Sequence, residues 1–484
     1  MRTAILVLVL TISAHSFAQS VIFWDPEIAV SDGSIYGSFR PRATVVDGDV
    51  PVVIYGKSGS ENLFISRWNG SGFDAPVAIL PTGTSAYLAD WTGPDIASKG
   101  DTVIAVFKLN PMESGNIYSV RSIDGGITFS DTIRVNSDET GNPWLPSMSI
   151  DQDGNPVVAH MTHDGAWTNP RYVIVNSVDA GVTYTNQMEI INVSGEACDC
   201  CPAEMIVDNQ RHLLLFRNND GNIRDIHGVL SLDGGSTYPF QENLDQLNWS
   251  IAGCPATGPD GVFIGDELIT AYTSGAEGVF KVYLSSSNVS SALTYNSRTP
   301  MAPAQLASDT QNYPRISTSN DTTVMAWAER ETGNTDIFYS LALTAANAVD
   351  SLTGNKWKAN ISTTGVQTTP EIVFKNGFVH LFYSDKFSGD VIYRRGVINS
   401  LLSVSELANE GAIFPNPSTD GSVQLNHVES VVSVTNTLGE NVEFSTSVIN
   451  TGLEMQIVRP AKGIYFVSYI HSNGQQYTEK LIMH

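Results

Sequence analysis

Short apolar runs that alternate with polar, glycine-containing turns extend along most of this chain. Between Cys198 and Tyr238, for example, the runs MIV, HLLLF and IHGVL are separated by such turns. Runs of this length, rich in aliphatic residues and bounded by turn residues, are typical of strands in a small antiparallel sheet. The pattern predicts an all-β protein.

The same group of three strands recurs about every 55 residues, which indicates a repeat architecture. A proline opens the first strand of each of seven units: Pro41, Pro94, Pro146, Pro202, Pro259, Pro314 and Pro370. One unit alone would leave both faces of its sheet uncovered, whereas units stacked radially cover one another. We therefore predict a seven-bladed β-propeller over residues 19–405, with six blades as the alternative. The seventh unit has no obvious fourth strand, and the run from Val21 to Trp24 can supply it.

One turn sequence occurs three times, at residues 122–129, 177–184 and 231–238, with starts 55 and 54 residues apart. It fits S-x-D-x-G-x-T-aromatic, in which the aspartate can accept hydrogen bonds from amides of its own turn. This turn resembles the Asp-box of sialidase-like β-propellers, also called the BNR repeat. The resemblance implies that Asp124, Asp179 and Asp233 form turns and are structural rather than catalytic.

The two ends of the chain differ from the repeats. Residues 1–18 combine Arg2, a short apolar run and Ser16-Phe-Ala18, which is typical of a secretory signal peptide. After a linker at residues 406–412, residues 413–484 predict a small β-sandwich, for which an ordinary Ig-like domain is the alternative. The PNP opening, the TLGE turn, the GIY strand and the terminal KL pair resemble the C-terminal sorting domain of the type IX secretion system. That resemblance implies the secretion machinery as a partner and release from the cell or display on its surface.

Charge narrows the choice of partners. The formal net charge of −24 argues against nucleic acid and anionic membranes as ligands. No later stretch is long and apolar enough to span a bilayer. An anionic glycan stays compatible with this charge, because a local cluster of arginines can override the sign of the whole surface.

The turns with the repeated aspartate lie between third and fourth strands, so we expect a ligand site on the opposite face of the propeller. Residues just before each repeated proline and just after each second strand surround the central funnel there. Arginines bind carboxylates and aromatic rings stack on sugars, so these residue types favour an acidic sugar as ligand. The alternative for each residue is a purely structural role, as an ion pair at a strand end or as a charge on the rim. The first strands contribute Arg40, Arg42, Trp91, Asp95, Trp144, Glu204, Asp260, Arg315 and Glu371, and the second strands are followed by residues that include Lys108, His163, Arg217, Glu329, Tyr383 and Asp385.

The resemblance to sialidases implies roles for several of these residues. Phe39-Arg-Pro-Arg42 approximates the Arg-aliphatic-Pro motif of that family at Arg40, and Arg217 and Arg315 are placed to complete a carboxylate-binding triad. The family also implies a tyrosine nucleophile activated by a glutamate, for which Tyr383 and Glu329 are the candidates. Among the carboxylates of the funnel, Asp95 is the candidate acid or base.

The end of one strand supports the choice of Arg217. The preceding residues Leu213-Leu-Leu-Phe216 are apolar without interruption, so the strand is expected to be buried on both faces and to end toward the funnel. We expect Arg217 to contact a ligand carboxylate, with pairing to Asp225 as the structural alternative.

The four cysteines lie in the connections that enter two neighbouring units. Cys198, Cys200 and Cys201 precede Pro202, and Cys254 precedes Pro255. Export favours disulfides, and four cysteines allow three pairings. One bridge from Cys254 to the first group would join adjacent blades, and the other two cysteines would pair within the group. The alternative is a copper or zinc site on the thiolates, although no recognised ligand spacing supports it; we expect no other cofactor.

Two classes of function remain. The first is a glycan-degrading enzyme, either a sialidase-like glycosidase or a lyase with His163 or Tyr383 as base. The second is a non-catalytic propeller that binds a glycan or a protein. A Tyr–Glu contact or paired carboxylates beside three arginines would favour the enzyme, and a funnel filled by side chains would favour the binding protein.

Overall fold

The computed structural model of the chain divides into two units, Ser20–Asn399 and a second unit that contains Ser400–His484. It describes residues 22–31, 38–57, 62–137, 141–185, 187–302, 308–331, 333–398, 413–437, 440–472 and 476–483. The predicted signal peptide, residues 1–18, and the predicted linker, residues 406–412, lie outside these ranges.

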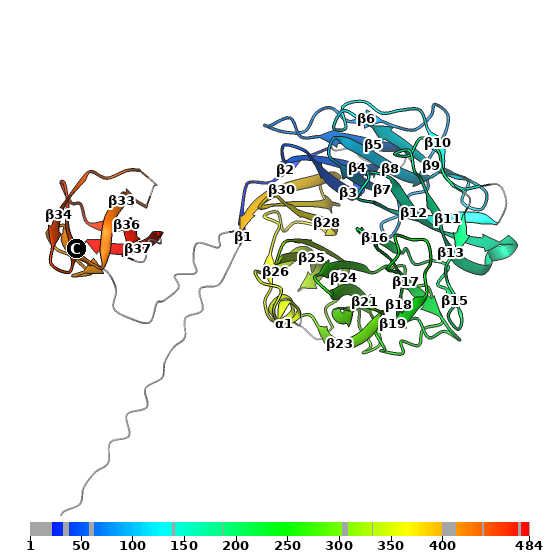
Figure 1. Cartoon of the computed structure of the whole chain (residues 1–484). Coiled ribbons are helices and arrows are strands. Elements are labelled where there is room, and N and C mark those ends of the chain that lie inside the picture. Colours follow the sequence, from blue (N-terminus) through cyan, green and yellow to red (C-terminus); the bar gives the residue numbers. More distant parts are fainter. Residues whose placement is uncertain are drawn as a thin grey trace, which may run out of the picture. The chain divides into compact units, whose positions relative to one another are not determined.

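Seven antiparallel sheets make up the described part of the first unit, and the strands of each follow one another from the inside outward (Figure 1). The first four are β3 (Ser38–Val46), β4 (Val50–Lys57), β5 (Asn62–Arg67) and β6 (Val77–Ala78); β7 (Asp95–Lys99), β8 (Thr102–Lys108), β9 (Ile117–Ser122) and β10 (Ile133–Arg134); β11 (Asn142–Ile150), β12 (Pro156–Asp164), β13 (Thr168–Asn176) and β14 (Met188–Glu189); and β16 (Glu204–Asp208), β17 (Arg211–Asn219), β18 (Ile226–Ser231) and β19 (Phe240–Asn243), with β15 (Glu196–Ala197) also on β17. The last three are β20 (Asp260–Ile264), β21 (Glu267–Ser274), β22 (Lys281–Asn288) and β23 (Thr294–Pro300); β24 (Gln311–Ser319), β25 (Thr322–Glu331), β26 (Asn334–Ala342) and β27 (Trp357–Lys358); and β28 (Gln367–Lys375), β29 (Phe378–Asp385) and β30 (Asp390–Ile398) with β1 (Ile22–Trp24) and β2 (Ile28–Ala29).

The innermost strands close into a ring. Each contacts the innermost strand of the next sheet, in the order β3, β7, β11, β16, β20, β24, β28 and back to β3. The outer strand of the last sheet is β1, whose Ile22 pairs with Ile398 of β30. The predicted propeller is therefore confirmed, its seven sheets correspond to the seven sequence units, and the N-terminal strand completes the last one as expected.

The faces of neighbouring sheets bury apolar side chains against each other. Trp144, Met161 and Tyr172 of one sheet pack in a single core with Leu214 and Phe216 of the next. Both faces of a sheet are covered in this way. Burial of each large apolar side chain contributes roughly 1.5–3 kcal/mol to the stability of the fold. This packing explains why the second strands of the units carry nearly continuous apolar sequence.

A bulge before the repeated proline shapes four of the inner strands. The pairing register shifts between Phe39 and Arg42, and it shifts in the same way in β11, β24 and β28. The residue that precedes the proline takes a positive φ in each of them: 50° at Arg40, 46° at Leu145, 55° at Tyr313 and 48° at Thr369. A β-bulge redirects the side chains that follow it, and left-handed backbone at non-glycine residues is a strain that concentrates at functional sites.

Within the described ranges, two short helices interrupt the strands, η1 (Gly165–Trp167) and α1 (Ala348–Gly354). The C-terminal unit forms two sheets, one of β31 (Ile413–Phe414), β32 (Ser422–Asn426), β35 (Gly452–Ile457) and β34 (Phe444–Ile449), and one of β33 (Val428–Asn436), β36 (Gly463–His471) and β37 (Gln476–Met483). Both contribute to one apolar core, as the predicted sandwich requires. Among the described residues, no helix is both long enough and apolar enough to cross a membrane.

Candidate functional site

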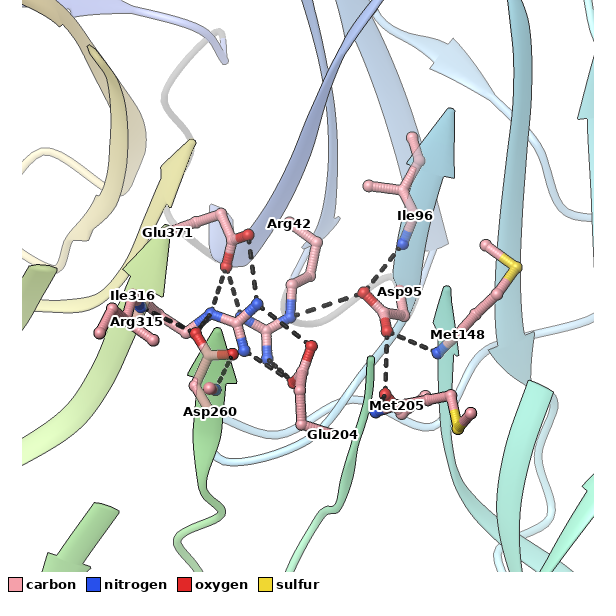
Figure 2. Close-up of polar contacts among 12 residues, drawn as sticks. Arg42, Asp95, Ile96, Met148, Glu204, Met205, Asp260, Arg315, Ile316 and Glu371 are labelled. Carbon is pink, nitrogen blue, oxygen red and sulfur yellow. Dashed lines mark hydrogen bonds and ion pairs between the residues drawn. The ribbon is translucent and has the colours of Figure 1, made fainter. Parts of the chain in front are cut away.

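Charged side chains from the innermost strands meet at the centre of the ring (Figure 2). They come from the position directly after the repeated proline in five sheets and two residues after it in a sixth. The set consists of Arg42, Asp95, Glu204, Asp260, Arg315 and Glu371. Residues far apart in the sequence are thus brought together because six of the seven inner strands each deliver one charged side chain to the axis.

Two arginines hold the carboxylates of this cluster. Arg42 donates through Nη1 to Glu371 Oε2 at 2.5 Å. Arg315 lies 2.7 Å from Glu204 through Nη1, and its Nε lies 3.2 Å from Asp260 and 2.9 Å from Glu371. These side chains are buried, apart from Arg315, whose side chain is 13% exposed. A buried charge is tolerated only when it is paired. The cluster is therefore a network in which each arginine serves two or more carboxylates.

The pKa values of two carboxyl groups of the cluster are raised above the ordinary range. Burial, reinforced by the charge of Glu204, raises the pKa of Asp95 to about 6. Burial likewise raises the pKa of Asp260 to about 7, although Arg315 opposes this effect. Burial also acts to raise the pKa of Glu204, but Arg315 and Arg42 outweigh it, and the net shift is downward. The difference follows from distance to the guanidinium groups, because a close cation favours the charged form.

Arg40 differs from the two arginines of the network. Its backbone N–H donates to Ser384 Oγ at 3.1 Å, but no hydrogen bond or ion pair of its guanidinium is found within the described ranges, and its Nε is buried. Burial, together with the nearby charges of Arg42 and Arg315, lowers the pKa of Arg40 to about 9. The guanidinium of Arg40 thus carries donors that no described residue accepts.

A small pocket lies over the cluster, and Arg40 forms part of its wall. Trp91, Glu204, Tyr313 and Arg315 also line it, together with several of the repeated prolines. Its volume of about 40 Å³ holds a few water molecules or one small polar group, but not a sugar ring. The described side chains around this pocket therefore leave little free space between the repeated prolines.

The predicted nucleophile and its activator lie apart from this pocket. Tyr383 donates to Glu27 Oε1 at 2.7 Å, so it does contact a glutamate, but not Glu329. Glu329 is fully buried and instead accepts from Gln311 and from Trp327, both at 2.9 Å, and from Lys356. Neither Tyr383 nor Glu329 lines the pocket. These contacts correct the prediction that Glu329 activates Tyr383 at the funnel.

Among the other candidates, Trp91 lines the pocket but Trp144 and His163 do not. Trp144 is 1% exposed and packs 4.5 Å from the ring of Tyr87, so it is a core residue and not a sugar-stacking surface. His163 is buried, with Nδ1 2.7 Å from the carbonyl oxygen of Asp164 and its ring stacked on Trp167. The prediction of Trp144 as a ligand contact was therefore wrong, and His163 is separated from the pocket.

Arg217 and Arg315 are both already saturated. Arg217 is 1% exposed and donates to the carbonyl oxygens of Arg224 and Thr273, both at 2.7 Å, and of Thr257 at 3.4 Å. The predicted burial of Arg217 was right, but its proposed contact with a ligand carboxylate was wrong, because backbone oxygens take its donors. Arg315 reaches the funnel as predicted, yet Glu204, Asp260 and Glu371 occupy it. Of the predicted triad, only Arg40 has a guanidinium without a partner among the described residues.

Sequence reasoning named Arg42, Glu204, Asp260 and Glu371 as funnel residues without giving them a role, and it did not name Tyr313. Arg42 and Tyr313 both neighbour a repeated proline. The signal was present in the repeat itself: the residue before the proline lines the pocket in three bulged strands, and the residue after it faces the axis. Aligning the units on their prolines would have selected both.

The repeated turns have the same geometry at all three sites. In the first, Asp124 accepts from the amides of Ile127 and Thr128 at 3.1 and 2.9 Å and from the Thr128 hydroxyl at 2.6 Å. Asp179 and Asp233 repeat the contacts with their own threonines, Thr183 and Thr237. Hydrogen bonds from the neighbouring hydroxyl groups lower the pKa of Asp124 to about 2. The geometry supports the structural role predicted for these aspartates.

The cysteines form one disulfide across two sheets. Cys200 and Cys254 are bonded, and the predicted bridge between neighbouring units is confirmed. Cys198 and Cys201 are free and buried, with their sulfur atoms 2.8 Å apart, so the second predicted disulfide is not formed in this structure. Cys198, Cys200 and Cys201 are close enough to hold a metal ion, but the bond to Cys254 removes Cys200 as a thiolate ligand.

Comparisons with known proteins characterise the two units separately. Residues 412–484 match the family model of the secretion system C-terminal sorting domain. The search of curated proteins found no match to this chain.

Among solved structures, a protein of unknown function from Dyadobacter fermentans is 12% identical with a TM-score of 0.47, and covers 78% of this chain and 99% of its own. A sialidase from Streptococcus pneumoniae is 9% identical with a TM-score of 0.45, over 72% of this chain and 83% of its own. An α-L-arabinanase from Penicillium chrysogenum is 11% identical with a TM-score of 0.44, over 78% and 98%. The chain thus consists of a β-propeller followed by a secretion system C-terminal sorting domain, which marks it for export by type IX secretion.

Proposed function

We propose that this exported propeller recognises an acidic glycan and that the carboxylate of one sugar enters the central pocket beside Arg40. The observation that carries the proposal is the unpaired guanidinium of Arg40 in the wall of that pocket. A ligand carboxylate would supply the two acceptor oxygens that this side chain lacks. Such a pairing would also offset the repulsion by Arg42 and Arg315 that lowers the pKa of Arg40.

The shape of the pocket supports the same ligand class. A volume of about 40 Å³ accommodates a carboxylate group, while the sugar ring stays above the pocket. Trp91 and Tyr313 line the pocket next to Arg40 and present aromatic surface to that ring. Apolar and aromatic walls with a few oriented polar groups are the usual composition of a small-ligand site.

The filled funnel favours recognition over catalysis. The carboxylates of the central cluster are held by Arg42 and Arg315, so none is free to act on a bond of a ligand above the pocket. We therefore place binding first. The sorting domain supports a location outside the cell, where polysaccharides are accessible.

A second candidate function is cleavage of the bound glycan, and Tyr313 is the observation that favours it. This tyrosine lines the pocket, and the charge of Arg40 opposes the effect of burial, which raises its pKa. A tyrosine next to a carboxylate-binding arginine is placed to exchange a proton with a bound sugar. Under this alternative, Tyr313→Phe abolishes turnover and leaves binding intact.

The experiment is a binding and turnover screen of the purified propeller against sialosides and uronic-acid polysaccharides. We expect binding to at least one anionic glycan, no binding to its carboxyl-reduced form, and a loss of at least about tenfold in affinity for Arg40→Gln. Arg330→Gln is the matched control, because Arg330 is exposed near the end of β25 in another blade and does not line the pocket. Equal affinity of Arg40→Gln and the unmodified protein, or no binding to any anionic glycan, would overturn the proposal.

A further inference from the structure

Three sulfur atoms lie next to one another in the loop that precedes β16. Cys198 Sγ is the middle one, 2.8 Å from Cys201 Sγ and 3.7 Å from Cys200 Sγ. Cys200 is bonded to Cys254, which belongs to the loop before β20. The free thiol of Cys198 thus lies close to the disulfide on one side and to the second free thiol, Cys201, on the other.

We propose that these four cysteines form a thiol–disulfide exchange site, in which one disulfide migrates between the inter-blade position Cys200–Cys254 and the position Cys198–Cys201. In the first step the Cys198 thiolate attacks Cys200 Sγ, a Cys198–Cys200 bond forms, and Cys254 leaves as a thiolate. In the second step Cys201, whose pKa is raised by burial, gives up its proton and attacks Cys198 Sγ, and Cys200 leaves as a thiolate that takes up a proton. Two thiols and one disulfide are present before and after, so no external oxidant or reductant is consumed.

The surroundings of Cys198 favour its thiolate. Arg224 donates through Nη1 to Cys198 Sγ at 2.9 Å. The hydrogen-bonded thiol of Cys201, with further help from Arg224 and Arg217, lowers the pKa of Cys198 to about 7 against the opposing effect of burial. Thiolates are the attacking species in disulfide exchange, so a thiol that ionises near neutral pH is well suited to the first step.

The same two arginines argue against the metal alternative. Both carry fixed positive charge beside the sulfur atoms, and a metal cation there would be repelled by them. A thiolate, in contrast, is stabilised by them. The electrostatics therefore select sulfur exchange over metal binding as the chemistry of this site.

Exposure separates the attacking sulfur from the leaving one. Cys198 and Cys201 are buried, whereas Cys254 is exposed. The thiolate that leaves in the first step is therefore released into water, which stabilises it, and it becomes accessible to reagents or to a thiol-reactive partner. The exchange site is thus also a latent modification site at Cys254.

Exchange would also change the restraint on the pocket. The disulfide joins the loops that continue into Pro202, Glu204, Gly258 and Pro259, all of which line the pocket. When the bond moves to Cys198–Cys201, the connection between these two walls is lost. The pairing of the cysteines is independent of which ligand the pocket takes, so this inference can be tested without knowledge of that ligand.

The test uses the purified full-length protein with two thiols per chain. One preparation is made by limited oxidation of the reduced protein and the other by limited reduction of the oxidised protein. Both are incubated anaerobically and labelled natively with N-ethylmaleimide, and non-reducing peptide mass spectrometry then identifies the disulfide and the labelled cysteines. We expect both preparations to give the same products, with Cys254 labelled and Cys198 bonded to Cys201. The rate of labelling should become independent of the concentration of N-ethylmaleimide, because the exchange step then limits it.

Two variants separate the steps. Cys198→Ser removes the attacking sulfur and is expected to slow labelling of Cys254 at least about tenfold. Cys201→Ser blocks only the second step and is expected to yield labelled Cys254 with a Cys198–Cys200 bond. The proposal is overturned if Cys254 stays unlabelled in both preparations of the unmodified protein, or if Cys198→Ser is labelled as fast as the unmodified protein. Circular dichroism of each variant confirms that the propeller is folded.

Discussion

Arg40 and Arg42 flank Pro41 on the same inner strand but have opposite environments. Arg42 donates to Glu371 at 2.5 Å, whereas no described residue pairs with the guanidinium of Arg40. The bulge at this proline accounts for the contrast, because it sends Arg42 to the axis and leaves Arg40 in the wall of the pocket. One strand thus supplies both a structural cation and a candidate ligand contact.

Substitution of these two arginines is expected to separate stability from binding. Arg42→Gln removes the closer of the two arginines that hold Glu371 and leaves this buried carboxylate to Arg315 alone. Loss of one member of a buried ion pair costs up to about 3–5 kcal/mol, and the remaining contact with Arg315 lessens this loss. Arg40→Gln removes a buried cation that has no partner and is expected to leave the melting temperature unchanged or to raise it. Differential scanning calorimetry of the two variants checks this. A melting temperature that falls as far for Arg40→Gln as for Arg42→Gln would show that Arg40 is a structural cation.

The space for Arg40 depends on a glycine of the neighbouring blade. A Cβ atom at Gly93 would lie 3.1 Å from Arg40 Cδ and 3.3 Å from its Nε, so Gly93→Ala must displace the arginine side chain. We expect a fall of about 3- to 10-fold in affinity for the anionic glycan with little change in melting temperature, because a displaced fork loses its bidentate geometry. Gly253→Ala is the control, since a Cβ there meets nothing within 4 Å. Unchanged affinity in Gly93→Ala would argue that Arg40 does not touch the ligand.

The repeat architecture could be predicted from the sequence because its determinants are local. Each strand is an apolar run between turn residues, and the stacking of units follows from the period alone. The closing strand at Ile22–Trp24 was predictable for the same reason, since one unit lacked a fourth strand. Burial of Arg217 also followed from its apolar strand.

The contacts of the site were not predictable, because they depend on non-local geometry. The acceptors of Arg217 include the carbonyl oxygens of Thr257 and Thr273, which are 40 and 56 residues away in the sequence. Every residue has a backbone oxygen, so the sequence does not indicate which ones accept these hydrogen bonds. Tyr383 contacts Glu27 because the N-terminal segment closes the ring beside it. The prediction that Tyr383 pairs with Glu329 did not take this segment into account. A one-residue shift at each bulge decides which side chain reaches the axis.

Deletion of residues 413–484 is expected to leave the propeller folded but not exported. The two units have separate apolar cores, so the first does not need the second for its stability. Cell fractionation of the native bacterium should find the truncated protein inside the outer membrane and the full-length protein outside the cell or on its surface. A melting temperature equal to that of the full-length propeller confirms folding, and normal export of the truncated chain would contradict the role of the sorting domain.

Asp245 is expected to make stability depend on pH. It is fully buried near Asp225, and burial, together with the charge of Asp225, raises its pKa to about 8. Because the pKa is higher in the folded than in the unfolded chain, the folded state holds this proton more tightly. The contribution of Asp245 to stability is therefore complete below about pH 4 and is lost as the pH rises toward 8, by up to about 1.4 kcal/mol per pH unit.

Asp245→Asn keeps a neutral group and should flatten this decline, so that the melting temperature of the variant rises relative to that of the unmodified protein between about pH 5 and 8.5. Asp266→Asn, at an exposed turn, should follow the unmodified protein. Parallel curves for Asp245→Asn and the unmodified protein would mean that Asp245 is ionised in the folded state.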